Sequence, residues 1–168
     1  MASFEQVAAG FWHPEIEHLR LPPLTDELVI DAERNLGVAL PLDLLHLLWT
    51  QNGGVIADAW DACPADTTFY ADDHVPFEHL YGIAPAGQAG TITLLDTPYL
   101  VQEWDLPSPV VLLSGQGHYW LALDYRDCGP EGNPPVVWID NEMKHELSLA
   151  PNFRTFVERL TASAAFPE

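Results

Sequence analysis

Acids and imidazoles lie next to each other at two places in the chain. Asp72 and Asp73 precede His74, and Glu78 precedes His79. A metal site needs ligands at set intervals, such as two histidines one helical turn apart or two cysteines separated by two residues. Neither spacing occurs here, so we expect no metal. The two groups then form either a solvated acidic loop or a docking surface for a cationic partner.

Two cysteines and a glycine-rich turn are the other features that could support chemistry. Cys63 and Cys128 are far apart, and nothing in the sequence puts a histidine beside either thiol to activate it. Two distant cysteines do not make a disulfide framework, so we expect both to be reduced. The stretch Ser114 to Gly117 leads into a strand, whereas a phosphate-binding loop leads into a helix. We therefore expect no enzyme activity and no cofactor.

The charge of the chain is strongly negative and unevenly distributed. Six Lys and Arg residues stand against 25 Asp and Glu residues, which gives a net charge of −19, and no Lys or Arg lies between Arg34 and Arg126. Nucleic acids and anionic membranes bind through cations that neutralise phosphates, so both are poor partners, whereas a basic protein fits. The alternative is that the acidity only keeps the protein in solution.

Helix signals dominate the first third of the chain. Thr25 suits an N-cap and apolar residues recur every four positions after it, which predicts a helix over 26–36. Pro41 opens a second helix that ends at Asn52-Gly53-Gly54, where two glycines permit a sharp turn. Trp49 follows the leucines of this second helix, so we expect it to be buried in the core.

Strand signals dominate the second half. Runs rich in β-branched and aromatic residues predict antiparallel strands at 110–113, 118–125, 136–139 and 145–149. Helices are expected on either side of them, at 97–104 and 151–160. The stretch 55–90 has no regular pattern, which is typical of a functional loop region. The sequence predicts a single α+β domain with a mostly antiparallel sheet packed against helices.

The two ends of the chain are expected to lie outside this domain. Residues 1–23 form an N-terminal extension whose three prolines permit a short helix at most, residues 24–162 form the domain, and residues 163–168 form a C-terminal tail. No apolar run reaches the roughly 20 residues of a membrane span, and no basic stretch followed by an apolar one opens the chain. We expect a cytoplasmic protein without a membrane partner.

Four pieces of the sequence, taken in order, resemble a known family. They are Leu40-Pro41 opening a helix that ends in Asn52-Gly53-Gly54, the run Gly117 to Arg126, the run Val136 to Asp140, and an apolar C-terminal helix. Together they resemble the SUKH superfamily of Smi/Knr type over residues 24–160. The resemblance implies an α+β fold. It also implies, for bacterial members, an immunity protein that binds and neutralises a toxin, often a nuclease or deaminase. Fungal members act as regulatory scaffolds.

The partner expected from charge and resemblance together is a basic toxin domain, bound without turnover. A regulatory or scaffold domain of the same fold is the alternative. Aromatic side chains supply most binding energy at interfaces, and charges set the rate and the selectivity of encounter. Alternate residues from His118 to Asp124 form either a recognition surface or a buried network that orients the sheet. The expected contacts are Trp60, Asp61, Asp66, Tyr70, Asp72, Asp73, Glu78, His118 and Trp120.

Overall fold

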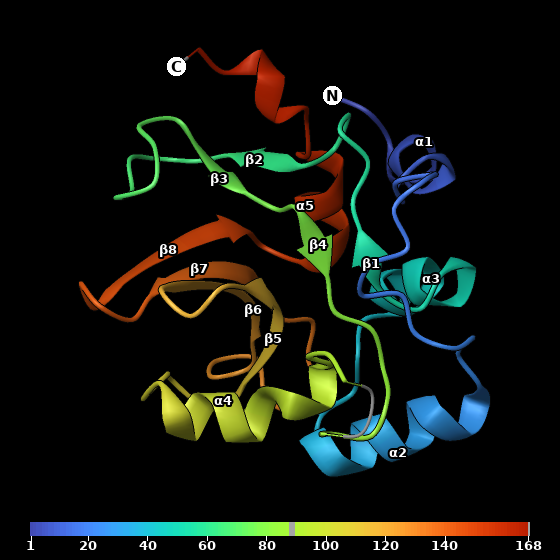
Figure 1. Cartoon of the computed structure of the whole chain (residues 1–168). Helices are drawn as coiled ribbons and strands as arrows, with labels where there is room; N and C mark the ends of the chain where they lie inside the picture. Colours follow the sequence, from blue (N-terminus) through green and yellow to red (C-terminus); the bar gives the residue numbers. More distant parts are fainter. Residues whose placement is uncertain (88–89, 168) are drawn as a thin grey trace.

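The computed structural model describes residues 1–87 and 90–167, and its longer helices begin where the sequence favours a helix start (Figure 1). The Thr25 side chain accepts a hydrogen bond from the Leu28 amide at the start of α2 (Asp26–Leu36). Helix α3 (Leu42–Thr50) starts directly after Pro41. The chain turns sharply at Gly53, whose φ of +84° suits a glycine. Both predicted helices are confirmed.

The second half of the chain forms one antiparallel sheet. Its strands are β5 (Val110–Gly115), β6 (Tyr119–Asp124), β7 (Val136–Asp140) and β8 (His145–Ala150), and they lie in the order β5-β6-β7-β8. A 3₁₀ turn, η1 (Leu94–Asp96), leads into α4 (Thr97–Glu103), which contacts β5, while α5 (Phe153–Glu158) contacts β8. The predicted α+β domain with an antiparallel sheet is confirmed.

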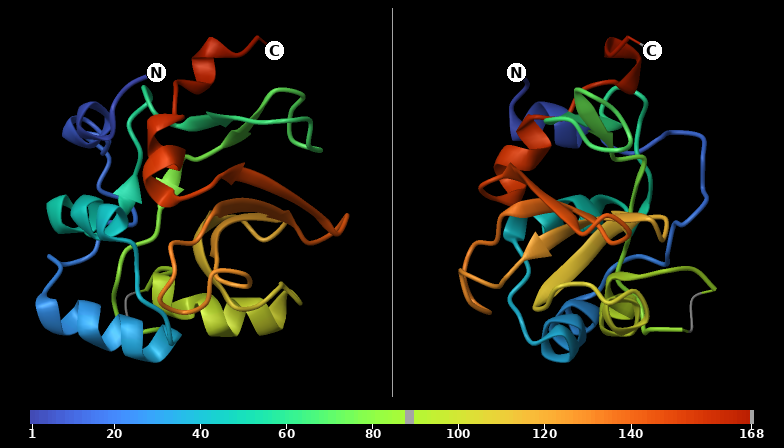
Figure 2. Two further views of the ribbon diagram at one scale, coloured as in Figure 1. Left: turned by 180° about the vertical axis from the view of Figure 1, so that it is seen from behind. Right: turned by 90° about the vertical axis from the view of Figure 1, so that its left-hand side faces the viewer.

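The stretch between α3 and α4 contains four short strands that the sequence did not reveal. Strand β1 (Gly54–Val55) pairs with β4 (His79–Leu80), and β2 (Ala62–Pro64) pairs with β3 (His74–Pro76). Strands of two or three residues are too short to show an alternating pattern. Figures 1 and 2 place the β2–β3 hairpin on one side of the large sheet and α4 on the other.

Both ends of the chain pack on the domain. Helix α1 (Phe4–Ala9) buries Phe4 and Val7 and contacts α5. After α5, Thr161 forms a β-bridge with Ala62, so the last residues run beside β2 as far as the 3₁₀ turn η2 (Ser163–Ala165). No helix among residues 1–87 and 90–167 has the length and apolar character needed to cross a membrane.

The expectation that Trp49 is buried was wrong. Its side chain is 47% exposed, whereas Leu44, Leu47 and Leu48 are almost completely buried. Residues four apart lie on the same stripe of a helix, so Trp49 shares a stripe with Leu45. Leu45 is the least buried of the four buried leucines of α3, because this stripe lies at the rim of the core.

Candidate functional site

The loop between β2 and β3 carries both exposed acids and exposed aromatics. Its tip is a tight turn in which Thr68 Oγ1 accepts hydrogen bonds from the Tyr70 and Ala71 amides at 3.1 and 3.5 Å. The turn leaves Phe69 57% exposed and Tyr70 43% exposed. We call this group the acidic hairpin surface, and its members are Asp66, Phe69, Tyr70, Asp72 and Asp73.

The aromatics of the acidic hairpin surface rest on the large sheet. The ring of Phe69 lies 6.2 Å from that of Tyr119 and 6.0 Å from that of Trp138, measured between ring centroids. Tyr70 lies 6.1 Å from Tyr119, and Tyr119 stacks on Trp138 at 4.4 Å. Aromatic pairs at such distances attract one another beyond the gain from burial. Phe69 and Tyr70 are therefore held in place before any partner arrives.

The C-terminal tail supports the other side of the hairpin. The ring of Phe166 stacks on that of His74 with centroids 4.2 Å apart, and His74 Nδ1 lies 2.8 Å from the Asp73 carboxylate. The Asp61 carboxylate accepts hydrogen bonds from the Ser163 amide at 2.7 Å and from its hydroxyl at 3.0 Å. Asp61, one of the expected partner contacts, is thus engaged within the chain.

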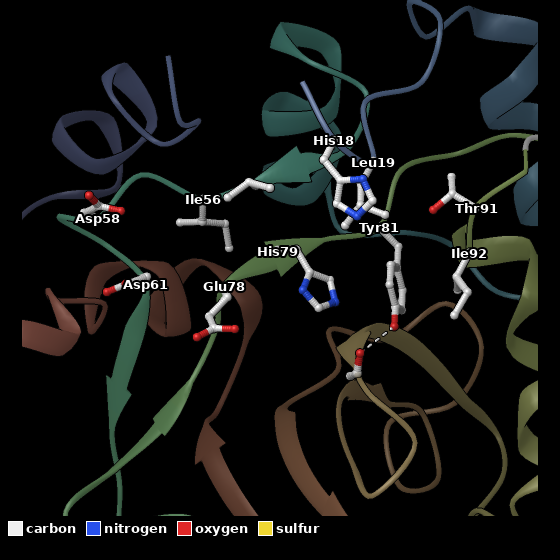
Figure 3. A pocket seen from close by; sticks show the side chains of 12 residues that line it. His18, Leu19, Ile56, Asp58, Asp61, Glu78, His79, Tyr81, Thr91 and Ile92 are labelled. Atoms are coloured by element: carbon white, nitrogen blue, oxygen red, sulfur yellow. Dashed lines mark hydrogen bonds between the residues drawn. The ribbon is translucent and has the colours of Figure 1, made fainter. Parts of the chain in front are cut away.

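A groove of about 490 Å³ lies beside the hairpin (Figure 3). Three acids stand at one end and two imidazoles in the middle, and an aromatic and an aliphatic side chain stand at the other end. The Tyr81 hydroxyl at this second end donates a hydrogen bond of 3.0 Å to the Gly115 carbonyl. The groups named are Asp58, Asp61, Glu78, His18, His79, Tyr81 and Ile92.

The charges of the two neighbouring sites have one sign. Burial raises the pKa of the Tyr70 hydroxyl, and the nearby charges of Glu78 and Asp61 raise it further, so the acidic end of the groove adjoins the hairpin. Burial also lowers the pKa of the His79 imidazole, which is therefore neutral at neutral pH. Asp58, Asp66, Asp72 and Glu78 take part in none of the ion pairs among the described residues.

The remaining expected contacts have different surroundings. Trp60 is half-buried and packs against the core. His118 is exposed at the turn between β5 and β6, where its Nδ1 lies 2.6 Å from the Glu142 carboxylate. The expectation for Trp120 was wrong, because it is 2% exposed and cannot reach a partner. All six residues of strand β6 are buried, so both faces of the strand are covered. The alternation of side chains along β6 therefore does not bring Trp120 to the surface.

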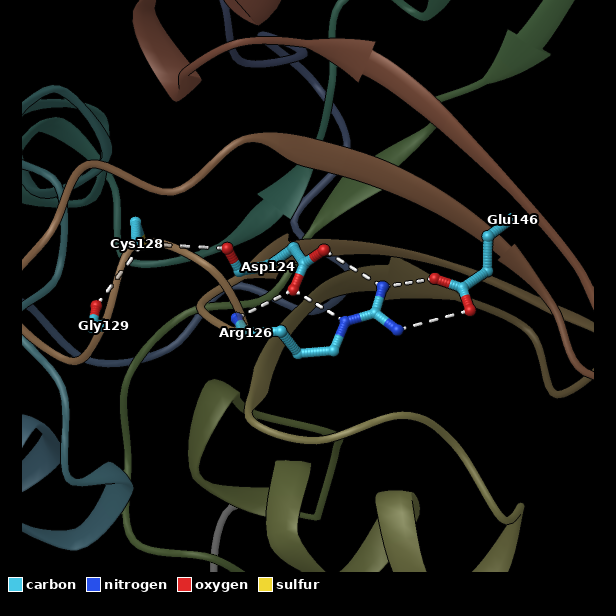
Figure 4. Close-up of polar contacts among 5 residues, drawn as sticks. All are labelled: Asp124, Arg126, Cys128, Gly129 and Glu146. Atoms are coloured by element: carbon cyan, nitrogen blue, oxygen red, sulfur yellow. Dashed lines mark hydrogen bonds and ion pairs between the residues drawn. The ribbon is translucent and has the colours of Figure 1, made fainter.

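Asp124, at the end of β6, belongs to a structural ion-pair network (Figure 4). Arg126 donates from Nε and Nη2 to the Asp124 carboxylate at 2.9 and 3.0 Å, and its guanidinium also contacts Glu146 of β8. Burial raises the pKa of Asp124, but the hydrogen bonds and the charge of Arg126 outweigh this and lower it overall. Six strand residues, about 20 Å, separate Asp124 from His118, so the two do not form one site.

Neither thiol is placed as a nucleophile. Cys63 is buried, and burial raises its pKa to about 12. Cys128 is exposed, and its Sγ donates to the carbonyl oxygens of Asp124 and Gly129 at 3.8 and 3.3 Å. An unactivated thiol is a poor nucleophile at neutral pH. Among residues 1–87 and 90–167, no three His, Cys, Asp or Glu side chains gather as a metal site would require.

Comparison with known protein families decides the affiliation of the chain. The model of the SMI1 / KNR4 family (SUKH-1) matches residues 23–159, which is most of the sequence. The chain belongs to the SMI1/KNR4 (SUKH-1) family. A search among curated proteins finds no match. The range that matches the SUKH-1 model includes the acidic hairpin surface and the large sheet, but excludes His18 in the groove and Phe166 in the tail.

Sequence reasoning missed two residues that the structure brings to the site. Phe69 was passed over, although a phenylalanine beside a tyrosine in a polar stretch is a signal of an exposed aromatic pair. His18 gave no signal, because it lies 61 positions before His79 and reaches the groove only through the path of the N-terminal segment. Only the folded chain brings these two imidazoles together.

Proposed function

We propose that this SUKH-1 protein is a cytoplasmic immunity protein that neutralises a basic toxin domain by direct binding. The family is generally one of toxin immunity proteins, and its members are typically non-catalytic. Inactive thiols and the separation of His118 from Asp124 agree with a role in binding. The acidic hairpin surface is the face that we assign to the toxin.

The observation that carries this proposal is the pair of exposed aromatics next to Asp66 and Asp72, which make no ion pair within the described residues. Phe69 and Tyr70 are ordered by the sheet beneath them, so little side-chain entropy is lost when a partner covers them. Asp66 and Asp72 stand on either side. Opposite charges raise the rate of encounter, and desolvated aromatics contribute most of the binding energy. A basic toxin domain is complementary to this surface in both respects.

Co-expression with the toxin tests the proposal. A toxin domain that a pull-down from the native cell identifies as the partner is produced in a susceptible host, with and without this protein. We expect growth to be restored by wild type, and a stable complex to co-purify from the rescued cells. A variant with Phe69→Ala and Tyr70→Ala should fold but fail to protect. Trp49→Ala, which truncates another exposed aromatic, is the matched control and should protect fully.

Two results would overturn the proposal. If wild type does not restore growth and does not bind the toxin domain, the protein is not its immunity protein. If a complex of cellular proteins co-purifies instead, and its assembly depends on Phe69 and Tyr70, the regulatory or scaffold role of the same fold replaces the immunity role.

A further inference from the structure

The groove described above is built partly by residues that lie outside the family match. His18 and Leu19 form one wall, and they precede residue 23, where the match begins. The opposite wall is β4, with Glu78 just before it and His79 in it. Ile56 is 1% exposed and lies in the lining. The volume of the groove, about 490 Å³, lies within the roughly 300–1,000 Å³ of ligand sites.

The lining changes from acidic to apolar along the groove (Figure 3). At one end Asp58 and Glu78 are exposed and make no ion pair within the described residues, and Asp61 adds a third charge. At the other end stand the Ile92 side chain, which is 37% exposed, and behind it the Tyr81 ring, which is 3% exposed. A ligand that satisfies both ends needs a cation and an apolar group side by side.

Among the described residues of the lining there is no Lys or Arg to compete with such a cation. His79 in the middle of the groove is neutral at neutral pH, because burial opposes its protonation. Its ring lies 5.3 Å from that of Tyr81, measured between ring centroids, and is tilted by 41° to it. The acidic side chains of the groove are its three carboxylates.

We propose that this groove binds an extended segment of the protein partner in which a basic side chain adjoins an apolar one. The basic side chain lies between Asp58 and Glu78, and the apolar one covers the exposed side chain of Ile92. The inference rests on the proposed function for the partner being a protein, and it adds the chemistry of the segment that is recognised. Charge complementarity favours this occupant over an acidic or a purely apolar one.

A short peptide amide, Gly-Arg-Arg-Leu-Leu-Gly, is the probe. Its affinity is measured by calorimetry, and its position by NMR shifts of the groove residues. We expect Asp58→Asn with Glu78→Gln to weaken binding about tenfold, which corresponds to about 1.4 kcal/mol for the two lost charges. The control is Glu103→Gln with Asp127→Asn, two exposed acids outside the groove. It changes the net charge equally and should bind within about twofold of wild type, as the long-range field is screened at about 8 Å.

The inference is overturned if both double variants lose affinity equally, because the peptide then senses only net charge. It is also overturned if Gly-Arg-Arg-Gly-Gly-Gly binds as well as the probe, or if the NMR shifts lie outside the groove. These failures leave the proposed function intact when the toxin is still neutralised. If the protein binds the probe in the groove but neutralises no toxin, the proposed function is wrong and the inference about the groove stands. Thermal melts of both double variants verify that they fold.

Discussion

Replacement of Arg126 by Met should destabilise the fold without affecting partner binding. The guanidinium makes two hydrogen bonds to Asp124, whose side chain is 11% exposed, and contacts Glu146 across the sheet. A hydrogen bond to a charged group contributes about 1.5–3 kcal/mol, but the Arg126 side chain is 33% exposed and exposed pairs contribute only about 0–1 kcal/mol. We therefore expect the free energy of unfolding to fall by about 2 kcal/mol.

Urea denaturation of wild type, Arg126→Met, Asp124→Asn and the double variant measures this effect. The coupling energy between Arg126 and Asp124 should be about 1–2 kcal/mol at pH 7, since the two side chains are in direct contact. A coupling below about 0.5 kcal/mol would refute the reasoning, because the pair would then behave as a solvent-exposed one. Affinity for the partner should not change, since Asp124, Arg126 and Glu146 lie outside the acidic hairpin surface and the groove.

The pH dependence of stability gives the same prediction a second readout. The pKa of Asp124 is lower in the folded chain than in the unfolded one. Its ionised form therefore stabilises the fold above the unfolded pKa of about 3.9, and this contribution is lost as pH falls through the folded pKa. In Arg126→Met the pKa of Asp124 is no longer depressed. The loss of stability between about pH 5 and pH 2 should be smaller in the variant than in wild type.

Three further predictions concern single side chains. Trp49→Ala should cost less than about 1 kcal/mol in urea melts, because a half-exposed ring leaves no core cavity; a loss above about 2 kcal/mol would contradict its exposure. Phe156→Ala should cost about 3–5 kcal/mol in the same assay, since Phe156 is fully buried and packs on Phe77; a near-neutral result would place it outside the core. A thiol reagent should modify Cys128 in the native protein and Cys63 only after unfolding; equal rates would contradict the burial of Cys63.

The helices and the large sheet were predictable because their signals are local. The Thr25 cap and the turn at Gly53 depend on neighbours along the chain, and so do the apolar runs that became β5, β6 and β7. Each run is long enough to show its character within one element. For the same reason, the predicted boundaries of these helices and strands lie within a few residues of the observed ones.

The candidate site was predictable only in part, because its geometry depends on contacts between distant residues. The acids and Tyr70 of the β2–β3 loop were found from charge and composition alone. Trp120 was predicted to be exposed because strand residues usually alternate between a buried and an exposed face. Strand β6 is buried on both faces, so alternation did not apply. The engagement of Asp61 by Ser163 joins residues 102 positions apart, which no local pattern reveals.

The rate of association with the toxin domain, measured at several salt concentrations, tests the central claim most directly. Asp66→Lys with Asp72→Lys reverses two charges of the acidic hairpin surface, and Glu103→Lys with Asp127→Lys makes the same change of net charge elsewhere. The hairpin variant should associate more slowly and dissociate faster, and part of the deficit should persist in high salt, because contact pairs are screened less than distant charges. The control should differ from wild type only at low salt. If the hairpin variant matches the control at every salt concentration, the acidic hairpin surface does not bind the toxin.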